Sequence, residues 1–552
     1  MNKFSKLLIA GLLWGTASFA QTAVKEAMPK DWHLQDHATT GFNGISLQQA
    51  YDFIKSKNLK SNKVIVAVID SGIDTLHEDL KPVMWVNKKE IPGNGIDDDK
   101  NGYVDDIHGW NFLGGKDGRN VKEDSYEAAR VYHKLKAKWE GKDVDVSKLS
   151  KSDKTEYETF LRAEQKIMGD ADPDETAFLQ AMLPKLKEGD SVIRKDLGKD
   201  EYTAKDLEGY TSENPLASTT SMMLVNIAKM NEGMDIKNTD ILGQFESEIR
   251  KIESAGKPPK AYRQEIVGDD PTNINDIGYG NNDIMAETSF HGTHVSGIIG
   301  AARNNGLGMD GIAGNVEIMT LRAVPDGDEH DKDIALAIRY AVDNGAKVIN
   351  MSFGKDFSPE KHWVDDAFRY AEKKGVLLIH AAGNDAKNID TAHNYPNPIY
   401  VNGGRATNVI TVGASGDAKN GGHTARFSNF GKNEVDVFAP GVGIYSTIPG
   451  GNTYGNASGT SMAGPVVAGV AALILEHFPN FTAQQVKYII EQSVTPATEK
   501  VKKPGTDEMV DLKELSRTGG YVNAHKAMVM AEEMSKTKMK LPKSKVKKSK
   551  KG

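Results

Sequence analysis

Short apolar runs rich in β-branched residues recur along two separated parts of the chain. The first reads K-V-I-V-A-V-I-D from Lys63 to Asp70. Such runs are typical of strands that are buried on both faces of a parallel sheet. The later runs are Val316 to Leu321, Ala346 to Met351, Gly375 to Ala381 and Val409 to Val412, with helical patterns over Lys332 to Asn344 and His362 to Lys374 between them. Strands that alternate with helices predict an α/β fold with a doubly wound, mostly parallel sheet, in which functional residues gather at the carboxyl ends of the strands.

The stretch 113–268 breaks this rhythm, because it is rich in charge and has helical apolar stripes. Helices are expected near Glu123 to Glu140, Asp174 to Lys187, Ser218 to Glu232 and Asp240 to Ser254. Another is expected to begin at Thr155, which forms a capping-box pair with Glu158. A disordered linker would not need such stripes. The pattern therefore predicts a large helical insertion that packs as a subdomain.

The first twenty residues have the pattern of a signal peptide. Lys3 and Lys6 precede an apolar run from Leu7 to Phe19, and Ala20 is a small residue at the expected cleavage point. A retained membrane anchor is the alternative, but it needs a longer apolar stretch. We expect an exported protein in a periplasmic, extracellular or cell-surface location, with no transmembrane segment in the mature chain. Segment 21–62 is a lead-in, the α/β domain occupies 63–112 and 269–533, and the Lys-rich tail 534–552 is expected to be solvated, with weak anchoring to an anionic surface as the alternative.

Composition excludes several classes of function. A net charge of −7 on a mixed surface does not favour nucleic acid as a partner, since nucleic-acid binding usually needs a basic face. The chain has no cysteine, which excludes disulfides, cysteine nucleophiles and thiolate metal sites. An exported protein without disulfides needs another stabilising element, and a bound metal ion is the first candidate.

Two motifs carry candidate acid–base residues. Asp70 closes the first apolar run and is followed by Ser71-Gly72, where a carboxylate can leave the sheet edge and meet a histidine; such turns also occur for structural reasons. His291 opens H-G-T-H-V-S-G, a helical segment of small residues that allows close packing. His294 lies three positions later, but the glutamate and the downstream ligand of a zinc protease helix are absent, so a structural role is favoured.

A serine and an asparagine complete the set. Ser461 lies in G-T-S-M-A-G-P, just before a helical run from Val466 to Leu475, with Pro465 expected in the first turn. At a helix N-terminus the free N–H groups and the helix dipole stabilise an oxyanion beside the serine, although serine is also an ordinary helix cap. Asn384 follows A-A-G at the end of an apolar run; its amide could donate to the same oxyanion, or it could be a turn residue.

Together these segments resemble the subtilisin-like serine proteases, or subtilases. The motifs V-A-V-I-D-S-G-I-D, H-G-T-H-V-S-G, A-A-G-N and G-T-S-M-A-G-P carry the resemblance, and the order Asp, His, Ser is also that of the family. The resemblance covers roughly Lys63 to Phe112 and Ile284 to Met528 and leaves the helical insertion unexplained. One departure is Gly464, where the family often has alanine or serine.

The resemblance implies a serine endopeptidase that acts on proteins or peptides. It makes Ser461 the nucleophile, His291 the general base and Asp70 the residue that orients the imidazole, with the Ser461 N–H and the Asn384 side chain as the oxyanion hole. It also implies that two strands flank the S1 pocket, with Asp385 near the rim, where a carboxylate could favour a basic P1 residue. The pocket residues are Ser352, Phe353, Gly354, Ala382, Gly383 and Asp385.

Structural Ca²⁺ is the expected cofactor. In N-G-I-D-D-D-K-N-G-Y-V-D-D, Asp97, Asp99 and Asn101 follow the first half of an EF-hand loop. Position twelve of that loop is His108, so Asp106 would have to close the cage, with the Tyr103 carbonyl as a backbone ligand. A solvated acidic turn is the alternative reading. The resemblance implies a second calcium site at Asp79 and Asn305.

Two other functions stay open. One is a catalytically inactive subtilase fold that serves as a binding module, although all four catalytic positions are intact. The other is a narrow-specificity processing protease whose insertion gates access. The insertion leaves and rejoins the domain near the candidate catalytic residues, so we expect a lid or an exosite and, as the alternative, a merely tolerated insertion.

Overall fold

The computed structural model describes residues 28–170, 173–230, 237–286, 289–419 and 421–537. The predicted signal peptide and residues 538–552 of the predicted tail lie outside the described residues.

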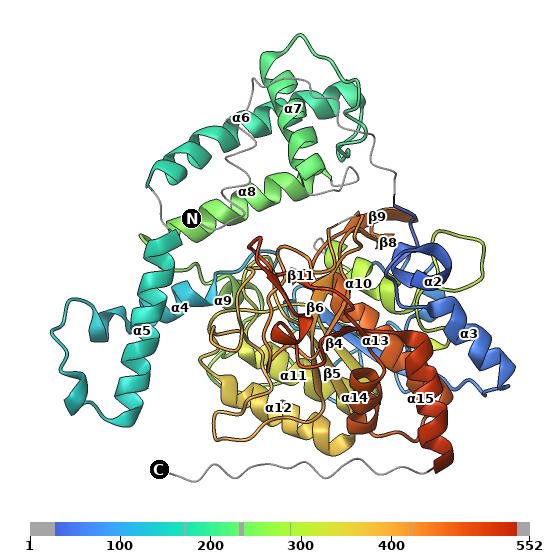
Figure 1. Cartoon of the computed structure of the whole chain (residues 1–552). Helices are drawn as coiled ribbons and strands as arrows, with labels where there is room; N and C mark the ends of the chain where they lie inside the picture. Colours follow the sequence, from blue (N-terminus) through green and yellow to red (C-terminus); the bar gives the residue numbers. More distant parts are fainter. Residues whose placement is uncertain (1–27, 171–172, 231–236, 287–288, 420, 538–552) are drawn as a thin grey trace.

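A nine-stranded sheet organises the α/β domain (Figure 1). In spatial order its strands are β10 (Thr495–Pro496), β13 (Gly520–Tyr521), β7 (Val437–Pro440), β6 (Val409–Ser415), β5 (Leu377–Ala381), β4 (Val348–Met351), β1 (Val64–Asp70), β3 (Val316–Arg322) and β2 (Gly109–Asn111). All neighbours pair in parallel except β10 with β13. The predicted fold class, a mostly parallel doubly wound α/β sheet, is confirmed.

Helices cover both faces of this sheet. One face packs against α3 (Leu47–Ser56), α10 (Phe290–Gly300), α13 (Thr460–His477), α14 (Ala483–Gln492) and α15 (Ala524–Thr537), and the other against α11 (Asp331–Asp343) and α12 (Lys361–Lys374). Alternation along β1 explains the two layers, because Val64, Val66 and Val68 enter the first core while Ala67 and Ile69 enter the second.

The strand order reverses at β1. β3 lies on one side of it and β4 on the other, and the later strands extend from β4. The carboxyl ends of strands at such a reversal are where α/β sheets place their ligand sites. Asp70 is the last residue of β1, so the fold puts this carboxylate at the expected position.

Smaller elements complete the described chain. They are the antiparallel hairpins β8 (Ile444–Ile448) with β9 (Thr453–Ala457) and β11 (Val501–Lys502) with β12 (Met509–Val510), the helices α2 (His37–Thr40) and α9 (Tyr262–Ile266), and 3₁₀ turns at Trp32–Leu34, Lys81–Val83, Val146–Lys148 and Leu512–Glu514. Two of them, α9 and the 3₁₀ turn at Val146–Lys148, lie within the insertion.

The lead-in segment belongs to the core. Leu47, Ala50 and Ile54 of α3 lie in the same apolar cluster as residues of α15. Trp32 is fully buried, and its indole N–H donates to the carbonyl of Gly443, one residue before β8, at 3.4 Å. The segment therefore ties the start of the described chain to the hairpin that precedes Ser461.

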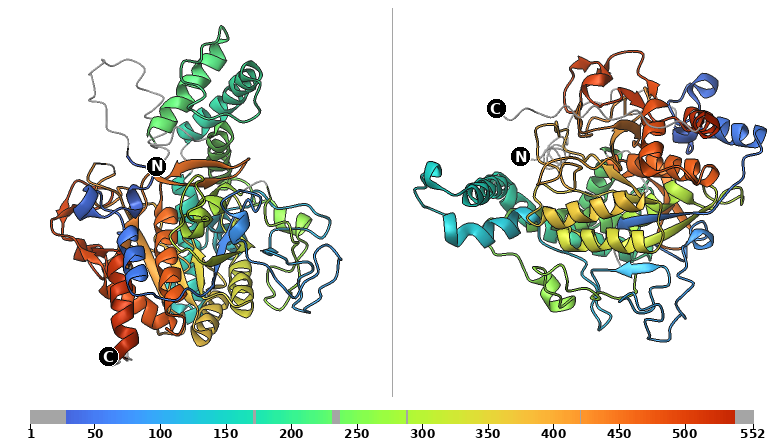
Figure 2. Two further views of the ribbon diagram at one scale, coloured as in Figure 1. Left: turned by 90° about the vertical axis from the view of Figure 1, so that its right-hand side faces the viewer. Right: turned by 90° about the horizontal axis from the view of Figure 1, so that it is seen from below.

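The insertion contains α4 (Glu127–Trp139), α5 (Lys151–Asp170), α6 (Pro173–Leu197), α7 (Pro215–Met230) and α8 (Asn238–Glu253). Helices α6, α7 and α8 share an apolar core of their own and project from the α/β domain (Figures 1 and 2). Helices α4 and α5 share a second cluster, which includes Phe357 of the α/β domain. The predicted capping box at Thr155 is wrong: α5 begins at Lys151, and the hydroxyl of Ser150 accepts the N–H of Asp153 at 3.0 Å.

A buried ion-pair network roots the insertion in the α/β domain. The Lys355 ammonium lies 2.8 Å from Glu127 of α4 and 2.9 Å from Asp331, and Glu127 also pairs with Arg130 at 2.7 Å. Burial alone would raise the pKa of Glu127, but the charges of Arg130 and Lys355 outweigh it and hold this pKa well below its usual range. Since removing one partner of a buried pair leaves an uncompensated charge, α4 cannot be deleted without cost to the domain.

Candidate active site

Asp70 and His291 form a hydrogen-bonded pair. The Asp70 side chain is 3% exposed, and its Oδ1 accepts the Ser71 N–H at 2.7 Å and lies 2.7 Å from His291 Nδ1. A carboxylate only accepts, so His291 carries its proton on Nδ1. Nε2 then holds a lone pair and can act as a base.

The position of His291 depends on its neighbour Gly292. A Cβ atom on Gly292 would lie 2.1 Å from the Gly72 carbonyl oxygen and 3.1 Å from the Asp70 Cβ. Only glycine lets α10 approach the Asp70–Gly72 turn this closely. Burial by itself lowers the pKa of His291, but the charge and hydrogen bond of Asp70 outweigh it, so the pKa is raised. The imidazole is 37% exposed and therefore reachable from solvent.

Ser461 is the second residue of α13. Its hydroxyl donates to the Ser352 carbonyl at 3.1 Å, and the Ser352 hydroxyl donates back to the Ser461 carbonyl at 2.9 Å. Pro465, expected in the first turn, lies in the second, because α13 begins at Thr460. Proline has no N–H for the carbonyl four residues earlier, and Ser352 supplies that missing donor.

Asn384 and the Ser461 N–H border one small space. A Cβ atom on Gly459 would lie 3.5 Å from Asn384 Nδ2 and 3.6 Å from the Ser461 nitrogen. Thr460 orients the amide, since its N–H and its hydroxyl both donate to Asn384 Oδ1 at 2.9 Å. The amide nitrogen therefore faces outward, and no described residue accepts from the Ser461 N–H. An oxygen atom in this space could accept from both donors.

The expected S1 residues lie just beyond strand ends, because β4 ends at Met351 and β5 at Ala381. Cβ atoms on Gly354 and Gly383 would lie 3.8 Å and 3.6 Å from Asn394 Oδ1, so this amide sits between the two segments. His380 lies alongside, donating from Nε2 to the Phe353 carbonyl at 3.0 Å, and burial lowers its pKa to about 4.

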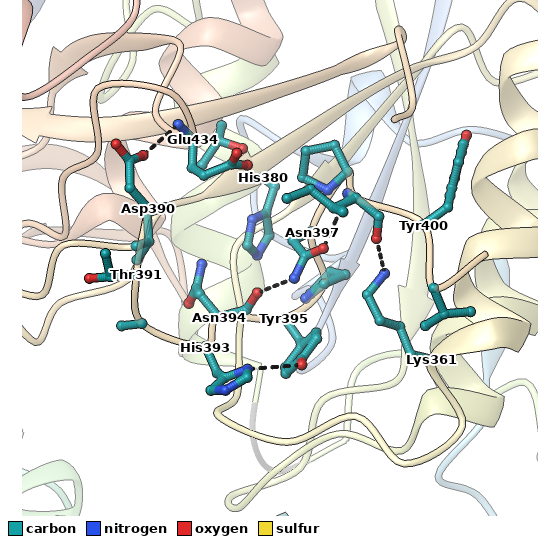
Figure 3. A pocket seen from close by; sticks show the side chains of 17 residues that line it. Lys361, His380, Asp390, Thr391, His393, Asn394, Tyr395, Asn397, Tyr400 and Glu434 are labelled. Carbon is teal, nitrogen blue, oxygen red and sulfur yellow. Dashed lines mark hydrogen bonds between the residues drawn. The ribbon is translucent and has the colours of Figure 1, made fainter. Parts of the chain in front are cut away.

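Figure 3 shows Asn394 and His380 side by side in the lining of a pocket of about 300 Å³. Both groups are uncharged at neutral pH. Asp385, expected near the rim, is exposed and pairs with Lys387 at 3.4 Å. The walls next to the glycines thus present neutral polar groups.

Three carboxylates converge in the acidic loop. Oxygen atoms of Glu90, Asp97 and Asp99 lie within 4.8 Å of one another. Asn101 belongs to the same loop, and its N–H donates to Asp97 at 3.0 Å and to Asp99 at 3.2 Å. Like charges at this spacing repel, and the oxygen-only donor set suits Ca²⁺. Sequence analysis missed Glu90, which precedes the EF-hand-like pattern and reaches it only through the fold of the loop.

Asp106 and the Tyr103 carbonyl are the other expected ligands, and Asn87 donates to both Asp99 and Asp106. The Asp106 side chain is fully buried, accepts from Asn101 at 2.9 Å and from Asn87 at 2.8 Å, and also bonds the Tyr340 hydroxyl. Burial raises the pKa of Asp106. It lies outside the group of three and does not close a cage with them. Tyr103 is buried with its ring against Trp110.

Asp79 and Asn305 are in contact. Asn305 Nδ2 donates to Asp79 Oδ1 at 2.6 Å, and the Tyr454 hydroxyl donates to Oδ2 at 2.8 Å. Asp79 is fully buried, so these hydrogen bonds satisfy it. Each carboxylate oxygen has two lone pairs, so both hydrogen bonds leave room for a cation on Asp79.

His294 lies apart from this chemistry. Its Nε2 faces the Gly455 carbonyl at 3.2 Å, and burial lowers its pKa to about 3. A neutral imidazole that donates to a backbone carbonyl has a structural role.

The site has the parts that serine hydrolases use: a serine at a helix N-terminus, an imidazole oriented by a buried carboxylate, and two donors around one small space. The model of the Subtilase family matches residues 61–519, and the chain belongs to that family.

Curated relatives agree with this assignment. The chain is 41% identical over 217 residues to a thermophilic serine proteinase of Bacillus sp. strain AK1 (39% of this chain, 48% of the relative). It is 36% identical over 218 residues to a thermostable alkaline protease of Halalkalibacterium halodurans (38% and 55%), and 38% identical over 209 residues to subtilisin DY of Bacillus licheniformis (37% and 70%). The chain thus spans about half the length of the first two relatives.

One described helix, α13, is long and apolar enough to cross a membrane by length and composition alone. It is buried in the core and carries Ser461, so we interpret it as the central helix of the α/β domain.

Proposed function

We propose that this chain is a serine endopeptidase that hydrolyses peptide bonds through an acyl-enzyme on Ser461. The observation that carries the proposal is the hydrogen-bonded Asp70–His291 pair at the same sheet edge as a serine with two donors beside it. Membership of the Subtilase family and the names of the relatives support the same reaction.

The proposed reaction begins with a rotation of the Ser461 hydroxyl away from the Ser352 carbonyl toward His291. His291 Nε2 takes the hydroxyl proton as Oγ attacks the substrate carbonyl, and Asp70 stabilises the imidazolium that forms. The oxyanion accepts from the Ser461 N–H and from Asn384 Nδ2. His291 then gives the proton to the leaving amine as the C–N bond breaks, and water activated by the same histidine releases the acid product.

We propose that the P1 residue is uncharged. Asn394 and neutral His380 border the space between Gly354 and Gly383, and Lys387 compensates the Asp385 charge that would favour a basic P1 side chain. Hydrolysis rates of a peptide series that differs only at P1 test this, and a preference for Arg or Lys would contradict it.

We propose one structural Ca²⁺ site in the acidic loop, held by Glu90, Asp97 and Asp99. The ion would neutralise three carboxylates that otherwise repel one another. Asp79 with Asn305 is the second candidate site, since these two side chains are already in contact.

We also propose export, on the pattern of residues 3–20. The compartment would be periplasmic, extracellular or the cell surface. Mass spectrometry of the protein from the native host should find Gln21 at the N-terminus, and a chain retained with Met1 in the cytoplasm would contradict export.

Ser461→Ala tests the central proposal. The variant should lose peptide hydrolysis and labelling by a fluorophosphonate probe while it keeps the melting temperature of the native protein. Ser458→Ala is the matched control, because Ser458 lies on the same segment and only accepts the Gly443 N–H. Absence of labelling in the native protein would favour the alternative function, an inactive binding module.

A further inference from the structure

The insertion is firmly attached to the loop that follows β4. The Arg162 guanidinium of α5 donates to the Asp356 carbonyl at 2.8 Å and lies 4.6 Å from the centre of the Phe357 ring. Lys166, one turn further along α5, pairs with the Asp356 carboxylate at 3.5 Å. Phe357 is buried in the apolar cluster of α4 and α5. This attachment begins only a few residues after Ser352.

The carboxyl half of α8 is attached close by. Arg250 pairs with Asp326 at 2.5 Å and with Glu123 at 3.4 Å, and the Ser247 hydroxyl lies 2.5 Å from that of Tyr126. Asp326 lies four residues after Arg322, the last residue of β3 and the register partner of Asp70. This end of α8 therefore stands on the β3 side of the catalytic aspartate.

The other end of α8 reaches the β8–β9 hairpin. The side-chain nitrogen of Lys237, the N-cap of α8, lies 3.4 Å from where a Cβ of Gly450 would be. The Gly450 N–H donates to Asp74 at 3.3 Å, and the Asp74 N–H donates to the hydroxyl of Thr293, two residues after His291, at 2.8 Å. This end of α8 thus lies near His291, whereas the other end lies near Asp70.

Helix α8 connects these two supports. It has 16 residues and is about 24 Å long at 1.5 Å per residue. Figure 1 shows it lying across the top of the α/β domain, between the β8–β9 hairpin and the α4–α5 region, and the left view of Figure 2 also shows the insertion above the domain. Both ends of α8 are linked to the catalytic pair, one through Asp326 beyond the end of β3 and the other through Gly450 and Asp74 to Thr293.

The two supports differ in strength. The attached side has ion pairs, a buried aromatic ring and the root network of Glu127 and Lys355. On the hairpin side, Lys237 meets a glycine, and its charge pairs with Glu201 of the insertion itself at 2.7 Å. Helices α6, α7 and α8 have their own core, formed among others by Leu186, Leu224, Ile241 and Phe245, so they can move as one unit.

We propose that α6, α7 and α8, here called the lid bundle, form a lid that is anchored at the α4–α5 side and rests on the hairpin at Gly450. The lid limits protein substrates to flexible, extended segments and unfolded chains, and it lifts from the hairpin to admit them. This substrate class rests on the proposed endopeptidase function. Short peptides enter without lifting the lid.

A cysteine cross-link tests the lid in a chain that has no cysteine of its own. Lys237→Cys combined with Pro449→Cys, joined by a short bis-maleimide, locks the lid bundle to the hairpin. Pro449 is chosen because its neighbour Gly450 has a positive φ of 96°, where any other residue is strained. The matched control joins Lys237→Cys to Glu201→Cys, a pair that lies within the insertion. Deletion of residues 115–268 is a poorer test, because it leaves the buried Lys355 without Glu127.

Three assays are run on each form of the enzyme. The first measures cleavage of one disulfide-bonded substrate protein in its native form and in its reduced, carboxymethylated form. The second measures hydrolysis of a short peptide, and the third measures labelling by a fluorophosphonate probe. Before cross-linking, the unfolded form should be cleaved at least tenfold faster than the native form. The 237–449 link should lower cleavage of both protein forms at least tenfold and change peptide hydrolysis and labelling less than threefold, while the control link changes none of them.

Unchanged protein cleavage by the 237–449 linked enzyme would overturn the lid. So would a failure of this pair to cross-link under conditions that join the control pair, or a link that lowers labelling as much as protein cleavage. A protein that is not labelled before cross-linking contradicts the proposed endopeptidase instead, so the two failures are distinguishable.

Discussion

Replacing Thr460 by valine removes a hydroxyl group and keeps the shape of a buried side chain. The lost hydroxyl is one of two donors that orient Asn384 Oδ1, and it also accepts the Gly383 N–H at 3.0 Å. A neutral hydrogen bond contributes about 0.5–1.5 kcal/mol, so a looser amide should lower kcat by about 2- to 12-fold. KM should stay unchanged, because an oxyanion donor acts mainly in the transition state.

The comparison with Asn384→Ala separates this role from a general loss of structure. Removing an oxyanion donor outright lowers kcat by about 10²–10³ in a subtilisin, so Asn384→Ala should lie in that range. If Thr460 acts only through Asn384, adding Thr460→Val to Asn384→Ala should cost less than twofold more. Thr460→Ser keeps the hydroxyl and should retain activity.

Steady-state kinetics on a peptide substrate, with melting temperatures alongside, provide the measurement. The orphaned Gly383 N–H costs about 1–3 kcal/mol of folding stability, so Thr460→Val should melt at a lower temperature. The same loss of kcat from Thr460→Val with and without Asn384 would refute the orienting role.

Other predictions concern the base, the oxyanion space and the metal. Activity requires neutral His291, whose pKa is raised by Asp70, so kcat/KM should fall as the pH is lowered through a value above 6.5. Asp70→Asn should move the midpoint of this fall to lower pH. An unchanged pH profile would contradict the Asp70–His291 pair. Gly459→Ala should lower kcat, because the added methyl group enters the space proposed for the oxyanion. The melting temperature should change little, because the backbone at Gly459 is extended (φ 163°). Full activity of this variant would show that the oxyanion does not bind in that space. Calcium at 100 Kd should stabilise the protein by about 2.7 kcal/mol. Asp97→Ala with Asp99→Ala should abolish that gain, whereas Asp98→Asn keeps it, and a retained calcium response in the double variant would make the loop only a turn.

The strands and the Asp70–His291 contact could be predicted because their signals are local. A buried parallel strand is a continuous apolar run, and β1 differs from its predicted span only at Lys63. Fold class follows from the alternation of such runs with helices, and the motifs around Asp70, His291, Ser461 and Asn384 lie at the ends of these elements.

Two failures have different causes, one local and one distant in the sequence. Thr155 and Glu158 satisfy a capping box in sequence, yet Ser150 caps the helix one turn earlier. Pro465 lies inside α13 because Ser352, more than a hundred positions away, takes the place of its missing N–H. Ser352 cannot be read from the residues around Pro465, whereas Ser150 and Asp153 form a competing cap pattern only five positions before Thr155.

The acidic loop shows the same limit. Its regular spacing predicts that Asp106 closes the cage, but the fold turns Asp106 inward to Tyr340 and Asn87. Glu90 lies beside Asp97 and Asp99, since its carboxylate accepts the N–H groups of Asp99 and Asp105 and is held in place by them. The spacing of ligands along a chain does not specify which side of a loop each one faces.

The buried Trp32 sets a boundary for self-digestion. A protease at high concentration trims its own exposed ends, and each cut survives in the population only if the remaining molecule stays folded. Cuts ahead of Met28 leave the described core unchanged, whereas a cut beyond Trp32 frees the indole from Gly443 and removes a contact that supports the β8–β9 hairpin. An autolysed sample should therefore contain ragged but active molecules that all begin before Trp32, and shorter chains should vanish as fast as they arise.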